Sequence, residues 1–386
     1  MYDFDKVSNR QGTYSMKYDP PSRGKPADVL PMWVADMDFP APPCVAEAMA
    51  RYVDFGIYGY SEPDAPYFEV VRNWFERQFN WQVKREWLAV TPGVVNAFYT
   101  GVHAFSQPGE GVLIQQPVYY PFGAAIRDTG RTMVVNELVN QNGHYVIDFD
   151  DFEAKAKQAK VFILCNPHNP VGRVWKRDEL MKMGEICVKY NVTVIADEIW
   201  QDLIYPGHKH LVFADLAPEF ASITATATAP SKTFNLAGLQ LANVFISNPE
   251  KKAQFNRAFA ASGLSQPNLM GLVSCAAVYE HGEPWMGDLL SYLKGNMDFL
   301  HNYIKENIPA VKVTQAEGTY LAWMDCRTLG KPPKELDEAI THKGKLWLNE
   351  GSTFGAGGAG FMRINVASPR VVLDDALKRL KTALDE

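Results

Sequence analysis

The sequence predicts an α/β fold in which a mostly parallel sheet is sandwiched by helices and joined to a smaller α+β domain. Apolar strands alternate with amphipathic helices through the middle of the chain, which is typical of doubly wound sheets with right-handed crossovers. Three strands run directly into distinctive segments at residues 166–172, 195–200 and 229–239. Because parallel strands end at one edge of a sheet, we expect these segments to meet where open α/β folds bind ligands.

Length and composition predict two domains. A chain of 386 residues with 47% hydrophobic residues can fill sizeable cores. The pattern changes after residue 311 to short strands and helices, and a helix over residues 285–307 is long enough to bridge two domains. We therefore predict a large domain at 50–283 and a small domain formed from both termini, 1–49 and 284–386.

The individual elements follow from apolar periodicity and from the Gly and Pro residues between them. Residues 1–30 are polar and rich in Pro and Gly, so we expect an arm that lies on the rest of the protein. Strands are expected at residues 87–90, 111–115, 132–138, 161–165, 192–196, 222–229, 243–247, 319–324 and 360–366. Helices are expected at residues 43–55, 67–79, 94–105, 150–159, 178–190, 249–261, 268–280, 285–307, 333–343 and 373–384.

Charge and cysteine usage exclude several classes of protein. A formal net charge of −6 and a pI near 5.8 provide no basic face for nucleic acid. The five cysteines form no CxxC pair, which predicts a reducing compartment with neither disulfides nor a metal site. The first residues lack a secretory signal, and no apolar run reaches the ~20 residues of a membrane span. We therefore expect a cytoplasmic protein without a nucleic-acid or membrane partner.

The two most informative residues are Lys232 and Asp197. Pro230 ends the strand before Lys232, so this lysine lies on the loop that leaves the strand, and Asp197 directly follows another strand. A lysine that can form a Schiff base and an aspartate that can hold a pyridinium proton are what pyridoxal 5′-phosphate (PLP) requires. Together with the segment around Asn169, these residues resemble the fold-type I family of PLP enzymes, the aminotransferase superfamily.

A transition from strand to glycine to helix at residues 91–97 offers a site for the cofactor phosphate. Its free N–H groups and the positive end of the helix dipole suit a dianion. Every βα unit has such a turn, but this one falls where the resemblance places the phosphate cup. The resemblance therefore implies phosphate contacts from Gly93, Val94 and Val95.

The resemblance implies further phosphate contacts and the absence of one contact that many relatives have. Thr228 and Ser231 are the hydroxyl candidates, because the family's usual serine is Ala229 here. In relatives a tyrosine reaches the phosphate of the neighbouring subunit, which implies Tyr60 and a homodimer with shared active sites. An aromatic core plug is the alternative for Tyr60. Where many relatives bind phosphate with an arginine, this chain has Gln240, which forfeits about 1.5–3 kcal/mol.

The resemblance also assigns the rest of the site. Tyr119 would lie flat on the pyridine ring and act with Lys232 and Asp197 in catalysis, whereas its neighbour Tyr120 would not. Asn169 would donate to the phenolic oxygen of the cofactor. Arg363 would clamp the substrate α-carboxylate with two parallel hydrogen bonds.

Two segments narrow the resemblance to one branch. Residues 33–39 (WVADMDF) and 230–235 (PSKTFN) are similar to the MalY/PatB branch of cystathionine β-lyase-like carbon–sulfur lyases. In that branch the first segment passes the carboxylate end of the substrate, which implies substrate contacts from Trp33 and Asp36. The alternative is a buried turn whose carboxylates cap backbone amides. Trp200, where many aminotransferases have tyrosine, also favours the lyase branch.

The resemblance implies a homodimeric PLP enzyme that eliminates the thiol from L-cystathionine and related L-cysteine S-conjugates, giving thiol, pyruvate and ammonia. Asp197 would keep the ring nitrogen protonated, and Lys232 would remove the Cα proton. An aminotransferase on the same scaffold is the nearest alternative. A regulatory PLP-binding protein that acts through a protein partner is a third, because fold alone does not decide function.

Overall fold

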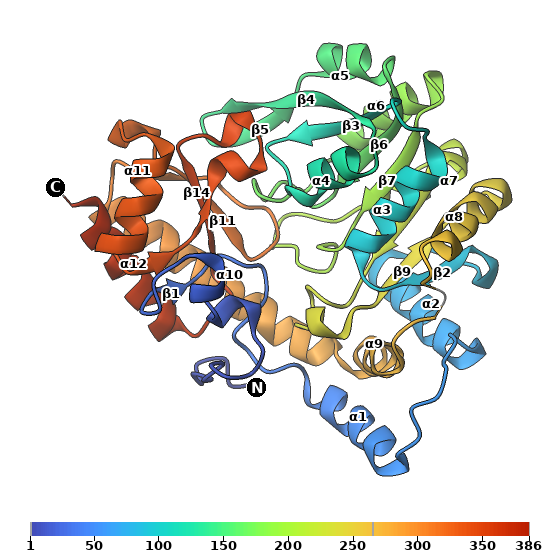
Figure 1. Ribbon diagram of the computed structural model, residues 1–386, viewed down its shortest axis with the longest axis horizontal. Coiled ribbons are helices and arrows are strands. Elements are labelled where there is room, and N and C mark those ends of the chain that lie inside the picture. Colours follow the sequence, from blue (N-terminus) through green and yellow to red (C-terminus); the bar gives the residue numbers. More distant parts are fainter. Residues whose placement is uncertain (1, 265, 386) are drawn as a thin grey trace.

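The structure is a computed structural model that describes residues 2–264 and 266–385 (Figure 1). In these residues the large sheet has eight strands in the order β2-β9-β8-β7-β6-β3-β4-β5. Their bounds are β2 Leu88–Thr91, β3 Gly111–Gln116, β4 Thr132–Gln141, β5 His144–Ile147, β6 Ala159–Cys165, β7 Thr193–Asp197, β8 Thr224–Thr228 and β9 Ala242–Phe245. Strands β8, β7, β6, β3 and β4 are parallel, whereas β9 and β5 are antiparallel to their neighbours. The predicted mostly parallel α/β sheet is confirmed.

Helices cover both faces of this sheet, because its central strands are apolar on both sides. In β6, Val161 and Ile163 face one core, which is closed by α3 (Val94–Phe105), α4 (Pro121–Asp128) and α8 (Pro249–Ala261). Phe162 and Leu164 face the opposite core, which is closed by α5 (Phe149–Ala156), α6 (Arg177–Lys189) and α7 (Pro218–Ile223). The sheet is therefore sandwiched as predicted.

A second sheet comes from the last third of the chain. Its four strands in the described residues are antiparallel in the order β10-β11-β14-β13, with bounds Lys312–Val313, Leu321–Asp325, Phe361–Asn365 and Asn349–Glu350. The helices around it are α10 (Glu283–Asn307), α11 (Pro333–Glu338), which continues as a π-helical turn over Ala339–Lys343, and α12 (Arg370–Leu384). The domain boundary at residues 50 and 283 stays a prediction.

The N-terminal segment packs against this second sheet. Strand β1 (Leu30–Pro31) pairs in parallel with β12 (Leu346–Trp347), and Figure 1 shows the blue arm lying beside the orange and red elements. The remaining helices are α1 (Pro43–Phe55), α2 (Ala65–Phe79) and α9 (Leu269–His281). Short 3-10 turns cover Met16–Tyr18, Pro21–Arg23, Arg85–Trp87, Phe213–Asp215, Ala237–Leu239, Arg327–Leu329, Gly351–Phe354 and Ala356–Gly358.

Several elements differ from the prediction. Helices α4 and α7 and the short strands β1, β10, β12 and β13 were not predicted. The strand expected at residues 222–229 begins at Thr224, because α7 runs to Ile223 and contains Ser222, whose hydroxyl donates a hydrogen bond to the Glu219 carbonyl at 2.7 Å. Strand β5 was not predicted. It returns antiparallel to β4 through Asn142 and Gly143, which both have positive φ, at 54° and 91°. Within the described ranges, none of the helices has the length and apolar character that crossing a membrane requires.

Candidate active site

A cavity of about 790 Å³ lies at the carboxyl edge of the large sheet. Asp197 ends β7, Asn169 follows β6 and Lys232 follows β8, so three neighbouring parallel strands deliver these residues to one place. Ten of the predicted residues line the cavity, namely Trp33, Gly93, Val94, Val95, Tyr119, Asn169, Asp197, Ser231, Lys232 and Arg363. The sheet-edge argument therefore located the cavity correctly.

Lys232 is half-buried and its amine is held by the backbone. Its Nζ donates to the Ala35 carbonyl oxygen at 2.7 Å and lies 5.5 Å from the centre of the Trp200 ring. Desolvation lowers the pKa of the Lys232 amine to about 8, although the carboxylates of Asp36 and Asp197 act in the opposite direction. A larger fraction of this amine is neutral near pH 8 than for an ordinary lysine, which suits a nucleophile or a base.

Asp197 is buried at the end of β7. Its Oδ1 accepts a hydrogen bond from the Ile199 N–H at 3.2 Å, and its Cα partners in the sheet are Cys165 and Ala227. Burial raises the pKa of the Asp197 carboxyl to about 7, which the Ile199 hydrogen bond and Lys232 partly oppose. A cationic group placed beside this carboxyl would stabilise its ionised form.

Arg363 lies on β14 and faces the cavity from the second sheet. It is 2% exposed, and its Nη atoms donate to Asn169 Oδ1 at 3.0 Å, to the Trp33 carbonyl at 2.9 Å and to Asn349 Oδ1. Its Nε is buried without a hydrogen-bond partner among the described residues. Burial lowers the pKa of Arg363 to about 10, so the site would favour an anionic ligand beside it.

The amino end of α3 lines another wall of the cavity. Gly93 precedes the helix with φ +91°, a conformation that favours glycine, and an added Cβ would meet nothing within 4 Å. The first N–H groups of a helix have no partner inside the helix, and here they belong to Val94 and Val95. Ser231 lines the same cavity. This end can accept a phosphate.

Tyr119, Tyr120 and Trp200 all line the cavity, but they differ in how far they are buried. Tyr119 is half-buried and lines the cavity, and burial raises the pKa of its hydroxyl above the ordinary range. Tyr120 also lines it but is 44% exposed. Trp200 is buried, with its ring 4.8 Å from that of Tyr320, so it forms an apolar wall behind Lys232.

Three predicted residues are not brought into this cavity. Thr228 is fully buried and donates to the Asn243 carbonyl at 3.1 Å on β9, so its hydroxyl is already used. Tyr60 is 95% exposed and lies in a shallow hollow beside Pro92 and Gln240. The Asp36 carboxylate differs from both expectations, substrate contact and backbone cap, because it binds the guanidinium of Arg10 at 2.7 Å.

Sequence reasoning missed three groups of the site. Asn349 binds Arg363, the Ala35 carbonyl binds Lys232, and the Tyr320 hydroxyl donates to that same carbonyl at 3.0 Å. The Ala35 carbonyl belongs to the WVADMDF segment, which was predicted from the sequence to lie at the site. No local pattern marks Asn349 or Tyr320.

The cavity fits PLP. Lys232 offers a desolvated amine, Asp197 a buried acid, and the amino end of α3 offers free N–H groups for a phosphate. Arg363 has a buried donor still to be satisfied. Each group meets one requirement of the cofactor, so the fold and the cavity together define a PLP-binding protein of fold type I.

Known proteins agree with this class. The aminotransferase class I and II family matches residues 27–380. The chain is 42% identical to cystathionine beta-lyase PatB of Bacillus subtilis (strain 168), over 99% of this chain and 100% of that protein. A PLP-bound structure from Clostridium difficile 630, provisionally described as an aminotransferase, has a TM-score of 0.98 and 42% identity, with 100% of both chains covered.

A third similar protein is cystalysin from Treponema denticola, whose structure contains PLP. Its TM-score is 0.96 and its identity 37%, over 100% of this chain and 99% of that one. The protein described here therefore belongs to the aminotransferase class I and II family, in the MalY/PatB branch that the segments at 33–39 and 230–235 predicted. PLP is its cofactor.

Proposed function

We propose that this protein is a PLP-dependent carbon–sulfur lyase that acts on L-cystathionine and related L-cysteine S-conjugates. A base removes the Cα proton, the Cβ–S bond breaks, and the thiolate leaves with the bonding electron pair. The remaining fragment hydrolyses to pyruvate and ammonia. The observation that supports this best is the desolvated Lys232 amine, in one cavity with Asp197 and Arg363, in a chain that is similar over its whole length to a cystathionine beta-lyase.

Bound PLP would draw electrons away from the substrate Cα and so make its proton acidic. Lys232 would bind the cofactor and then accept this proton, for which a pKa near 8 is well matched to near-neutral pH. Asp197 would keep the ring nitrogen protonated, and Tyr119 would stack on the ring. Arg363 would orient the α-carboxylate, and Trp33, which stacks on Trp347 at 4.3 Å, would close the wall beside it.

We assign the phosphate to Gly93, Val94, Val95 and Ser231, with Tyr60 reaching it from a second subunit. The chain carries exposed apolar residues around Tyr60, which are Val53, Phe55, Ile57 and Tyr58. Exposed apolar patches of this kind mark interaction sites. The hollow that contains Tyr60 also includes Pro92 and Gln240, which line the cavity too. A homodimer with shared active sites follows from this assignment. The cytoplasmic location stays a prediction.

The experiment is to incubate the purified holoenzyme with L-cystathionine without any keto acid, while following pyruvate, free thiol and the cofactor spectrum. Steady pyruvate formation, with the cofactor remaining in its aldehyde form, is expected. Stoichiometric conversion to the pyridoxamine form without pyruvate would instead identify an aminotransferase. That second candidate is favoured by the provisional description of the Clostridium difficile relative.

A further inference from the structure

One loop holds both cations of the cavity. The segment 33–39 offers its Trp33 carbonyl to Arg363 Nη2 at 2.9 Å and its Ala35 carbonyl to Lys232 Nζ at 2.7 Å. These two carbonyls are two residues apart on the same stretch of backbone. The distance between the amine and the guanidinium therefore depends on where this loop lies.

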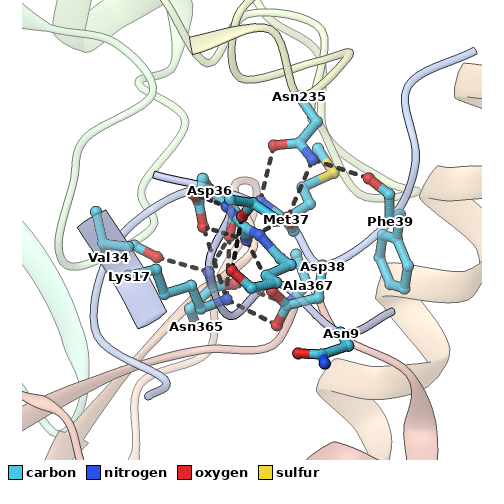
Figure 2. A network of polar contacts seen from close by, with 12 residues as sticks. Asn9, Lys17, Val34, Asp36, Met37, Asp38, Phe39, Asn235, Asn365 and Ala367 are labelled. Carbon is cyan, nitrogen blue, oxygen red and sulfur yellow. Dashed lines mark hydrogen bonds and ion pairs between the residues drawn. The ribbon is translucent and has the colours of Figure 1, made fainter. Parts of the chain in front are cut away.

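The N-terminal arm binds the same loop through two acidic side chains. Arg10 donates to both carboxylate oxygens of Asp36, at 3.1 and 2.7 Å, and to Asp38 Oδ1 at 2.8 Å. Lys17 Nζ donates to Asp38 Oδ2 at 2.8 Å and lies 3.7 Å from Asp36 Oδ1. Figure 2 shows Lys17, Asp36 and Asp38 close together within this set of contacts. Two cations and two anions thus form one compact network.

Burial makes this network sensitive to the loss of any member. Lys17 is 1% exposed and Asp38 is 5% exposed. Buried ions are tolerated only when their partners are well placed, and a charge left alone is strongly destabilising. The bidentate geometry of Arg10 on Asp36 also fixes direction as well as distance. The network therefore favours one loop position over its neighbours.

The arm also reaches the loop backbone, because Arg10 Nη1 donates to the Met37 carbonyl at 3.0 Å and Lys17 Nζ to the Asp36 carbonyl at 3.5 Å, and other parts of the protein bind the same backbone. Asn365 Nδ2 donates to the Val34 and Asp36 carbonyls at 2.8 and 2.6 Å, and Asn235 Nδ2 donates to the Met37 carbonyl at 3.0 Å (Figure 2). These bonds reach the loop backbone from β14 and from the lysine loop. The arm adds the contacts of Arg10 and Lys17 with the Asp36 and Asp38 side chains, which lie outside the cavity.

We propose that Arg10 and Lys17 are positioning residues, which bind Asp36 and Asp38 and so hold the Ala35 and Trp33 carbonyls at the spacing that Lys232 and Arg363 require. This proposal rests on the proposed function only for its kinetic consequence. It also gives the two acids of the WVADMDF segment a role behind the cavity rather than in contact with substrate.

The test compares Arg10→Ala with Lys25→Ala in the holoenzyme. Lys25 tethers the same arm by an ion pair of equal length, 2.7 Å to Asp337, but within the described residues it forms no hydrogen bond or ion pair with the loop 33–39, and it is therefore the matched control. Arg10→Ala is expected to speed hydrogen–deuterium exchange across residues 33–39 and to lower kcat/KM on the order of tenfold. Arg10→Lys should restore part of both, and Lys25→Ala should change neither.

Measuring kcat and KM separately distinguishes a positioning role from a loss of folded protein. Fewer folded molecules would lower kcat and leave KM unchanged, whereas a displaced Arg363 raises KM. If Arg10→Ala does not fold, Arg10→Ala/Asp36→Ala removes one charge of each sign and leaves Lys17 paired with Asp38. It should show the same faster exchange.

Equal exchange and equal KM in the Arg10 and Lys25 variants would overturn the proposal. The exchange measurement does not need turnover. A wild-type enzyme that forms no pyruvate from cystathionine would refute the proposed function, while the exchange comparison would still decide the role of Arg10.

Discussion

Arg363 Nη1 donates to Asn169 Oδ1 at 3.0 Å, across 194 residues of sequence. A guanidinium has only donors, so Asn169 must present its carbonyl oxygen to Arg363, which leaves its NH₂ group free to donate elsewhere. None of the described residues accepts a hydrogen bond from this NH₂ group in the structure. Arg363, the residue proposed to bind the substrate, therefore fixes the orientation of the Asn169 amide that the proposed donation to the phenolic oxygen of the cofactor requires.

Replacing Arg363 should weaken substrate binding, and its main kinetic effect should be on KM. Arg363→Ala is expected to raise KM roughly tenfold to a hundredfold, because it removes charge-assisted hydrogen bonds to the α-carboxylate. Arg363→Lys should recover only part of this, since a point charge cannot form two parallel bonds. Steady-state kinetics with cystathionine measures both. Arg327→Ala is the control, because Arg327 is exposed and paired with Asp325. An unchanged KM in Arg363→Ala would show that the carboxylate binds elsewhere.

Lys232→Ala should abolish turnover and the absorbance of the lysine-bound cofactor, because the amine that binds it is gone. Lys252→Ala is the matched control. Burial lowers the pKa of Lys252 to about 8 as well, but its amine donates to the Leu88 carbonyl at 2.5 Å and it does not line the cavity. Borohydride treatment followed by peptide mapping reports the attachment site. Cofactor that borohydride still fixes covalently in Lys232→Ala would contradict the assignment.

Asp197→Asn should lower turnover on the order of 10²-fold or more, because an amide cannot hold the ring nitrogen in its charged form. The fold should persist, since the amide is isosteric and can still accept from Ile199. Asp202→Asn is the control, because Asp202 is also buried but accepts a hydrogen bond from the Thr233 hydroxyl at 2.7 Å outside the cavity. Turnover reports the activity of each variant, and circular dichroism reports whether the variant is folded. Near-normal turnover in a folded Asp197→Asn protein would mean that another group protonates the ring.

The same carboxyl makes the stability of the cofactor-free protein depend on pH. Its pKa is raised from 3.8 to about 7, so the folded protein binds this proton more tightly than the unfolded chain. The contribution to stability is fully present below pH 3.8 and is lost as the pH rises to about 7, with a slope of at most about 1.4 kcal/mol per pH unit. Asp197→Asn removes the titration. The free energy of unfolding of the variant minus that of wild type should therefore be larger at pH 7 than at pH 5.

Urea unfolding of both cofactor-free proteins at the two pH values provides this difference. A difference that stays constant with pH would mean that the carboxyl is not desolvated in the folded protein.

The sequence predicted elements best where their end signals are local. The predicted bounds of α1 and α8 are those of the structure, because α1 begins at Pro43 and ends before Gly56 in a left-handed conformation, and Asn248 caps α8. Strand β5 was missed although Asn142 and Gly143 form a known hairpin signal. The reversed direction of β9 has no local signal, because pairing partners decide it.

The site was predictable where residues follow strand ends, and not where they meet by tertiary packing. Lys232, Asp197 and Asn169 each occupy the end of a parallel strand, so their meeting follows from topology. The contact of Asn349 with Arg363 depends on two short strands pairing, and that of Arg10 with Asp36 on how an irregular arm packs. Neither leaves a pattern in the sequence around it.

The pairing of β1 with β12 also has a consequence for synthesis on the ribosome. Residues 30–39 emerge among the first, but their backbone partners Trp347, Asn365 and Ala367 are translated near the end of the chain. The nascent segment cannot dock until more than 300 further residues have been translated, because the paired positions Leu30 and Leu346 are 316 residues apart in sequence. Contacts of such long range form slowly and late. A nascent chain released before β14 would therefore carry Lys232 without the backbone carbonyl held in place to receive it.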